Sequence, residues 1–409
     1  MAAGRKVLNR FTIVAAIAVL LSRGAAVSAQ SLPAGPVRAL DGRLVASGEI
    51  TGTFGEADES AYFNYTDYEH NALRMLRAAL TASWRPTERL ALVGEVRSEN
   101  MRDVRAYAAY VRIRPLRGRA FDVQAGLIPP TFGAFSRRAY ASDNFMIGFP
   151  LAYQYLTSLR SDAVPATADD LLRMRGRGWR SSFPIGSYYE GPGLSLISAF
   201  RWDAGVQARW ETGPLELSSS ITTGSISNPR YDNDVGGSKL SGRVALRPIT
   251  GLVLGASATR SNWLSREVTA VVPARDYSQR AFGADAEYSR DYWLVRGELV
   301  WAAWDLPYLG AAGQPGTVSA VGAWIEGRYR VTPRVFVALR GDRLGFSSIA
   351  DSQRTEMPWD APMQRGELVG GYYFQRNLVA RLGVQRNVRL GAGRVRSRTY
   401  VTGQLTYWF

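Results

Sequence analysis

Apolar and polar residues alternate along the chain in segments of about ten residues from residue 43 onward. Near 377–388, for example, Leu378 and Leu382 fall on one face of an extended chain, and Arg381 and Gln385 fall on the other. A period of two over such a length is typical of a β-strand with one apolar and one polar face. The chain is therefore predicted to be all-β.

The connections between these segments alternate between short and long. Short ones such as "RPTER" and "TGP" carry the turn residues of tight hairpins, whereas long ones such as "SSIADSQRTEMPWDAP" are rich in Ser, Asp and Pro. Short turns at one end and long loops at the other are typical of an outer-membrane barrel, and an even number of strands places both chain ends on the short-turn side. The connections predict about sixteen strands, near 43–54, 72–85, 89–98, 103–114, 120–127, 204–212, 215–224, 238–247, 250–262, 279–290, 291–304, 317–331, 334–345, 364–375, 377–388 and 395–409.

The chain ends in "RTYVTGQLTYWF", in which Leu405, Tyr407 and Phe409 occupy one face and Thr406 and Trp408 the other. The more apolar face is expected to meet lipid. Aromatic residues also lie near the short-turn ends of other predicted lipid faces, at Trp84, Trp210, Tyr288, Trp293, Tyr329 and Phe374. These residues are expected to form a girdle at one membrane interface.

The first 29 residues predict a secretory signal peptide. A basic start with Arg5 and Lys6 precedes the apolar run 11–21, and small residues follow up to Ala29. No later stretch is apolar over the length that a membrane-spanning helix needs. Residues 30–409 are therefore predicted to be exported and to form a transmembrane antiparallel β-barrel.

Composition adds two facts to this picture. The chain has no cysteine, which excludes a disulfide framework and a cysteine-ligated metal site. Lysine occurs only at positions 6 and 239 among 50 basic residues, and the net charge of +15 becomes +11 without the four positive charges of the signal peptide. Arginine is therefore the cation with which this protein would bind anions.

With this strand pattern, a signal peptide and a terminal Phe409, the sequence resembles bacterial outer-membrane β-barrel proteins. In such proteins a final strand that ends in Phe, with apolar residues at alternate positions, is read by the barrel-assembly machinery. The resemblance implies this role for Leu405, Tyr407 and Phe409.

Two segments are similar to parts of porins of the phosphate-selective O/P type. They are "AGLIPPTFGAF", residues 125–135, and "WDAGVQARWETGPLELSSSITTGS", residues 202–225. The lysine-rich clusters associated with the phosphate site of that family have no counterpart here. The resemblance therefore implies a porin without naming its solute.

The segment 128–203 is too long for a plain connection in a compact fold, and we expect this loop to fold inward and narrow the lumen. Within it, Thr167 and Asp170 have the spacing of a capping box for a short helix, which Gly176 would end. The arginines around this helix predict an electropositive constriction formed by Arg137, Arg138, Arg160, Arg173, Arg175, Arg177 and Arg180. The alternative is that these arginines pair with acids of the same loop or face water.

Opposite charges recur two residues apart on the predicted lumen face. The pairs are Glu95 with Arg97, Arg209 with Glu211, Arg296 with Glu298, Glu326 with Arg328, and Arg340 with Asp342. Residues at this spacing are about 7 Å apart on one face of a strand. The charges are therefore expected to hold water and cross-strand partners in the wall, and to leave selectivity to the loop. The predicted lumen-wall arginines are Arg209, Arg296, Arg328, Arg340 and Arg381.

These features predict an outer-membrane porin for passive diffusion of small hydrophilic solutes, with arginine favouring anions. The alternatives are a non-conducting adhesin or structural barrel and an outer-membrane hydrolase. The single histidine, His70, lies in a polar loop, and we predict no enzyme activity, no cofactor and no metal. Expected partners are outer-membrane lipid, the barrel-assembly machinery and small anionic solutes, and not nucleic acid. The sequence leaves open whether the barrel is a monomer or a homotrimer.

Overall fold

The computed structural model describes residues 33–58, 63–64, 71–116, 118–199, 201–230, 233–310, 315–391 and 397–409. The predicted signal peptide, residues 1–29, and His70 lie outside these residues. Within them, Gly35–Phe409 forms one compact unit. No helix in the described residues is long and apolar enough to cross a membrane.

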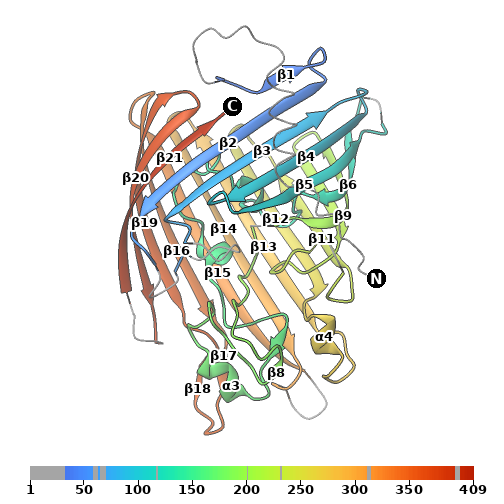
Figure 1. Cartoon of the computed structure of the whole chain (residues 1–409), viewed down its shortest axis with the longest axis vertical. Helices are drawn as coiled ribbons and strands as arrows, with labels where there is room; N and C mark the ends of the chain where they lie inside the picture. The colour runs from blue at the N-terminus through green and yellow to red at the C-terminus, as the bar shows by residue number, and fades with distance from the viewer. Residues whose placement is uncertain are drawn as a thin grey trace, which may run out of the picture. The chain divides into compact units, whose positions relative to one another are not determined.

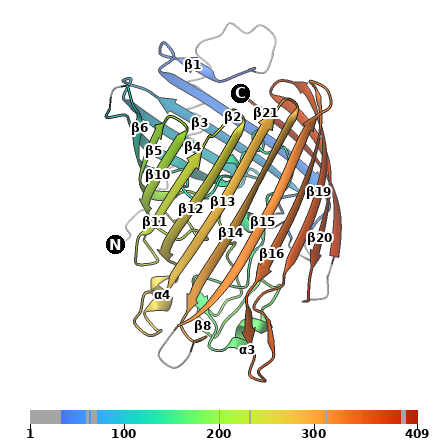
Figure 2. The same cartoon turned by 180° about the vertical axis from the view of Figure 1, so that it is seen from behind.

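This unit is a closed antiparallel β-barrel (Figures 1 and 2). In the described part of the chain the sheet holds 17 strands, and sixteen of them form the wall because the short β1 (Val37–Ala39) pairs only with β2. The wall strands are β2 (Leu44–Gly55), β3 (Met75–Trp84), β4 (Leu90–Glu99), β5 (Asp103–Ile113), β6 (Ala120–Ile128), β9 (Asp203–Thr212), β10 (Leu215–Thr222), β11 (Lys239–Leu246), β12 (Leu252–Asn262), β13 (Ser278–Arg290), β14 (Trp293–Leu306), β15 (Gly316–Arg330), β16 (Val335–Phe346), β19 (Met363–Gln375), β20 (Leu378–Arg389) and β21 (Ser397–Trp408). The predicted strand number and antiparallel barrel are confirmed.

The barrel closes between its first and last wall strands. Strand β21 pairs with β2 only from Glu49 to Gly55, and β1 pairs with the remaining start of β2. Beyond the strand, the amide of Phe409 donates to the Gly48 carbonyl at 3.0 Å, and the Gly48 amide donates back at 3.1 Å. The C-terminal residue therefore takes part in closing the barrel, at the short-turn end (Figure 1).

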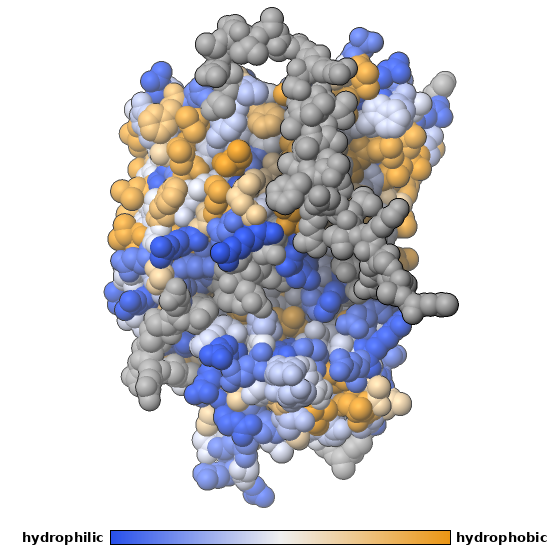
Figure 3. Space-filling model, viewed as in Figure 1, coloured by the Kyte–Doolittle hydropathy of each residue, from blue (hydrophilic) through white to orange (hydrophobic). Residues whose placement is uncertain are grey.

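The two faces of the wall separate apolar from polar side chains as the alternation predicts. On β15 and β16 the apolar Ile325 and Leu339 are exposed on the outside, whereas Glu326 and Arg340 are buried on the lumen side. Figure 3 shows apolar residues gathered on the outer surface near the short-turn end, with hydrophilic residues toward the long loops. Exposed aromatic residues at that end match the predicted girdle, at Trp84, Trp210, Tyr288, Trp293, Tyr329 and Phe374.

Shorter elements lie in the long connections. The segment between β6 and β9 contains the 3-10 helix η1 (Ser136–Arg138), α2 (Leu151–Gln154), β7 (Ala163–Val164), α3 (Ala168–Arg173) and β8 (Ile185–Gly186), and other loops contain α4 (Arg266–Thr269), β17 (Ser348–Ala350) and β18 (Glu356–Pro358). The predicted capping box at the start of α3 is confirmed, because Thr167 accepts from the Asp170 amide and the Asp170 side chain accepts from the Thr167 amide.

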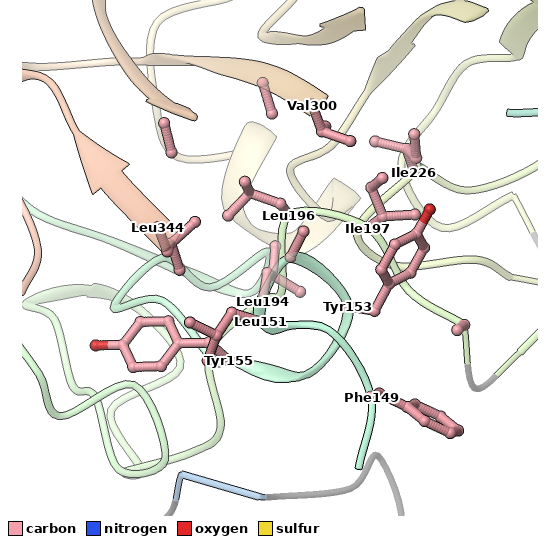
Figure 4. Packing of buried hydrophobic residues seen from close by; sticks show 14 of the residues in the cluster. Phe149, Leu151, Tyr153, Tyr155, Leu194, Leu196, Ile197, Ile226, Val300 and Leu344 are labelled. Atoms are coloured by element: carbon pink, nitrogen blue, oxygen red, sulfur yellow. The ribbon is translucent and has the colours of Figure 1, made fainter. Parts of the chain in front are cut away.

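The main apolar core lies inside the barrel, between the long loop and the wall. Loop residues such as Leu151 and Leu196 pack with Val300 of β14 and Leu344 of β16 (Figure 4). The inner face of β14 is apolar toward its long-loop end, where Val300, Ala302, Trp304 and Leu306 are all buried. The loop therefore folds inward, as predicted, because part of the inner wall offers it an apolar surface.

Candidate functional site

The long loop turns into the lumen directly after β6. Gly133 has a φ of +74°, and a Cβ there would lie 2.6 Å from Glu298 Oε1, so only glycine fits this turn. Its amide donates to Ser257 Oγ at 3.1 Å, and the next amide, that of Ala134, donates to Glu298 Oε1 at 3.0 Å. The turn thus binds the loop to two strands on the inner wall, β12 and β14.

Buried wall carboxylates accept hydrogen bonds from further backbone amides of the loop. Glu49 accepts from the amides of Ala141 at 3.0 Å and Ser142 at 2.8 Å. Three strands away around the wall, on β19, Glu367 Oε1 accepts from the amides of Ile147 at 3.0 Å and Gly148 at 3.1 Å. Because donors bonded to a carboxylate are held more strongly than those bonded to neutral groups, these residues fix the loop to strands from both ends of the chain.

A buried charge cluster lies behind this loop segment. Arg340 contacts Glu367 at 2.7 Å, Asp342 at 3.2 Å and Glu326 at 3.3 Å, and its side chain is inaccessible to solvent. Asp342 in turn accepts from the amide of Leu151 at 3.2 Å. Arg340 therefore supports the carboxylates that hold the loop, and it does not line an open passage.

Three of the five charge pairs spaced two residues apart are also in direct contact, namely Glu95 with Arg97, Arg209 with Glu211, and Arg340 with Asp342. Among the described residues, Arg296 forms no ion pair with Glu298, and Glu326 forms none with Arg328. Arg296 instead bonds Glu326, which lies directly opposite on the neighbouring strand. Directly opposed side chains are about 5 Å apart, closer than residues two apart on one strand, so the cross-strand partner is favoured.

The remaining lumen-wall arginines contact the loop or a neighbouring acid. Arg296 and Arg328 lie over the ring of Phe145, with Cζ at 4.5 and 5.5 Å from its centroid. Arg381 donates to the carbonyl of Ala141 at 2.8 Å. Arg209 is about one third exposed and pairs with Glu211 and Glu216. Among the predicted wall arginines, Arg209 is thus the one whose ion pair is most open to solvent.

The loop arginines divide into two groups. Arg138 pairs with Glu287 of β13, and its neighbour Arg137 shares helix η1. The other five come from the segment around α3, which lies beside β17 and β18 at the long-loop end (Figure 1): Arg160, Arg173, Arg175, Arg177 and Arg180. Arg138 and the arginines around α3 are therefore bound to different parts of the barrel.

Several arginines near α3 pair within their own loop, as the alternative stated. Arg160 is buried and binds Asp162 at 2.8 Å, Arg173 binds Asp170 at 3.0 Å, and Arg180 binds Glu190 at 2.8 Å. Among the described residues, no acid forms an ion pair with Arg175 or Arg177. These two are the arginines of the run whose charge is least compensated.

Two aspartates position this arginine run. Asp360, before β19, accepts from the amides of Ser158 and Gly176, both at 2.7 Å, and burial raises the pKa of its carboxyl. Asp169 of α3 accepts from the Ser352 amide at 2.8 Å, and hydrogen bonds from the Ser352 side chain and then from this amide lower the pKa of Asp169. The run is thus fixed to the β17–β18 hairpin and to the start of β19.

A second basic region, which the sequence analysis missed, surrounds a cavity of about 480 Å³ at the short-turn end. Its lining includes two acids, Asp41 and Glu88, and five arginines, Arg43, Arg85, Arg89, Arg112 and Arg114. Arg112 pairs with Asp122 at 2.7 Å. The density of arginine in the short turns "RPTER" and "RIRPLRGRA" is the sequence signal for this region, although turns of this composition also fit plain hairpin connections.

Comparison with solved structures places this architecture among known barrels. An anion-selective porin from Comamonas acidovorans has a TM-score of 0.54 at 11% identity, covering 90% of this chain and 99% of that one. OmpT, an outer membrane protein of Vibrio cholerae, has a TM-score of 0.53 at 10% identity, covering 90% and 98%. The fold is a porin-type β-barrel. The outer membrane channel DcaP of Acinetobacter baumannii is also similar, with a TM-score of 0.51 at 11% identity, covering 91% and 99%.

No family model matches this porin-type barrel, and no curated protein matches its sequence. The narrower resemblance to O/P-type porins therefore stays a prediction. Closed antiparallel barrels with an apolar outer belt belong to the bacterial outer membrane, where short turns face the periplasm and long loops face outward. The 480 Å³ cavity accordingly lies at the periplasmic mouth and the α3 region at the extracellular mouth.

Proposed function

We propose that this protein is an outer-membrane porin that allows passive diffusion of small hydrophilic solutes and favours anions. The observation that carries the proposal is the arginine-lined periplasmic mouth, where five arginines and two acids surround one cavity. A charged rim on low-dielectric walls concentrates ions of the opposite sign, and fixed arginines favour anions.

The extracellular mouth supports the same preference. Arg175 and Arg177 lie there, and no described acid forms an ion pair with either. Part of the positive charge of the wall between the mouths is neutralised, because Arg296 is bound to Glu326 and Arg209 to Glu216. An anion would thus meet uncompensated arginine at both ends of the pathway.

The test is the reversal potential of single channels in a planar bilayer under a potassium chloride gradient. The variant replaces four cavity arginines by Ser, at positions Arg43, Arg85, Arg89 and Arg114, and leaves the ion-paired Arg112 in place. A matched control makes the same change of charge in short-turn residues outside the cavity, at Arg290, Arg330, Arg334 and Arg376.

The wild-type channel should be anion-selective, and the cavity variant should shift toward cation permeation by more than the control. Cation selectivity in the wild type, or equal shifts in both variants, would refute the assignment of anion preference to this mouth. If well-assembled protein gives no current steps, the adhesin or structural alternative is favoured. Hydrolysis of a lipid or ester substrate without current would favour the enzyme alternative.

A further inference from the structure

The outer surface of β9 to β13 contains a groove that the diffusion pathway does not use. Two adjoining hollows of about 700 and 750 Å³ share the same floor. The floor follows one row of register partners across five strands, Ala208, Ser219, Gly242, Ala258 and Phe282. Strands lie about 4.8 Å apart, so the row spans about 19 Å.

Larger apolar side chains border this floor on both sides. Toward the long loops lie Ile221 and Leu240, both more than half exposed, and toward the short turns lie Trp210 and Val244. Because wall strands are inclined by about 35–45° to the membrane normal, a groove that crosses them is also inclined. Its shape and polarity suit an extended acyl chain.

Two arginines lie at the long-loop side of the groove and give it a polar end. Arg260 and Arg280 are direct register partners on β12 and β13, in the row that contains Ile221 and Leu240. Like charges directly opposite each other on a sheet destabilise it unless an anion lies between them. A negative charge bound next to Arg260 and Arg280 on the outer surface of the barrel would therefore stabilise the sheet.

The protein supplies only part of that counter-charge. Asp305 accepts from Arg280 at 3.1 Å, but the same carboxylate also accepts from Ser278 and Thr317. In the described residues no acid pairs with Arg260, and Arg280 Nε has no partner. The positive charge at the end of the groove thus exceeds the local negative charge.

We propose that this groove binds a phosphorylated glycolipid of the outer leaflet, with one acyl chain over the Gly242 floor and a headgroup phosphate between Arg260 and Arg280. Guanidinium groups bind phosphate oxygens through paired hydrogen bonds, and one phosphate would relieve the repulsion between the two arginines. The site lies at the extracellular end of the barrel, where such headgroups are found. It is independent of whether the barrel conducts ions.

The test is native mass spectrometry of the detergent-solubilised barrel titrated with diphosphoryl lipid A, because one spectrum reports both the bound lipids and the number of chains. The wild type should retain one lipid, and should retain the same glycolipid without phosphates much less. The variant Arg260→Gln with Arg280→Gln should bind about tenfold more weakly or worse. Arg343→Gln, another outward-facing arginine outside the groove, is the matched control.

A second variant tests the acyl part of the site. At Gly242 an added Cβ would meet nothing closer than Ser218 O at 4.0 Å, so Gly242→Leu should fill the groove without disturbing the sheet. It should reduce lipid binding while both arginines remain. Wild-type protein that retains no lipid, equal loss in Arg343→Gln, or unchanged binding in both groove variants would overturn the proposal. A different number of chains per complex in a groove variant than in the wild type would also overturn the proposal, because the groove would then be an interface between copies of the protein.

Discussion

Removing the carboxylate of Glu49 should release one end of the inward loop without opening the barrel. Glu49 is buried on β2 and accepts the amides of Ala141 and Ser142 at 3.0 and 2.8 Å. Hydrogen bonds to a charged group contribute about 1.5–3 kcal/mol each, and water entering the vacated space would recover part of this. We therefore expect Glu49→Ala to weaken local docking by about 2–4 kcal/mol.

This difference can be measured by amide hydrogen exchange on the solubilised barrel. At 1.4 kcal/mol per factor of ten, the amides of Ala141 and Ser142 should exchange roughly 30 to 700 times faster. Amides of the wall strands should keep their protection. The control is Glu211→Ala, which removes a lumen carboxylate that pairs with Arg209 and lies outside the loop contacts. Unchanged exchange in Glu49→Ala, or equal acceleration in both variants, would show that this carboxylate does not hold the loop.

Further predictions concern assembly, acid and selectivity. Replacing Phe409 by Asp should block membrane assembly and leave export intact, because the variant loses the apolar ring that covers Gly48 where the barrel closes and places a charge there. Heat-modifiability on gels would report this, and normal insertion would contradict it. The Asp169 contact with the Ser352 amide should persist as pH falls to the ordinary aspartate pKa of 3.8 and be lost only below it. Hydrogen bonds from the Ser352 side chain and amide lower the pKa of Asp169, so the stabilisation is lost as pH falls through the lowered value. The amide shift of Ser352 in an NMR titration checks this, with loss of the contact above pH 4 as the opposing result. Replacing Arg175 and Arg177 by Ser should move the reversal potential toward cations, and an unchanged potential would assign these arginines to the structure of the loop.

The wall strands were predictable because each one carries its own signal. The strand predicted near 204–212 spans Asp203–Thr212, and the one near 377–388 spans Leu378–Arg389. Alternation reports which face meets lipid, and short turns with Pro, Gly or Asn report where strands end. Helix α3 was predictable for a similar reason, since a capping box is a local pattern.

The interior was less predictable because its contacts join distant parts of the chain. The carboxylate that accepts from the Ile147 amide belongs to whichever wall strand faces that part of the loop, which is β19. Residues 145–155 have no apolar–polar periodicity from which this strand could be predicted. One sequence feature does indicate that the lumen is partly filled. The end of the strand predicted at 291–304 is apolar on both faces, with Trp301 toward lipid and Val300 and Trp304 toward the lumen, which indicates that something apolar packs inside.

The anchoring of the loop also determines when it can dock. The amide of Ala141 and its acceptor Glu49 are 92 residues apart, and Ile147 and its acceptor Glu367 are 220 residues apart. Contacts this distant in sequence form late, because the intervening chain must be ordered first. Glu367 lies on β19, the third wall strand from the C-terminal end of the chain, and so reaches its position only when β19 has joined the wall. Because the loop is held by strands near both ends of the chain, it can make all of these contacts only when the wall strands on either side of the barrel closure are in place.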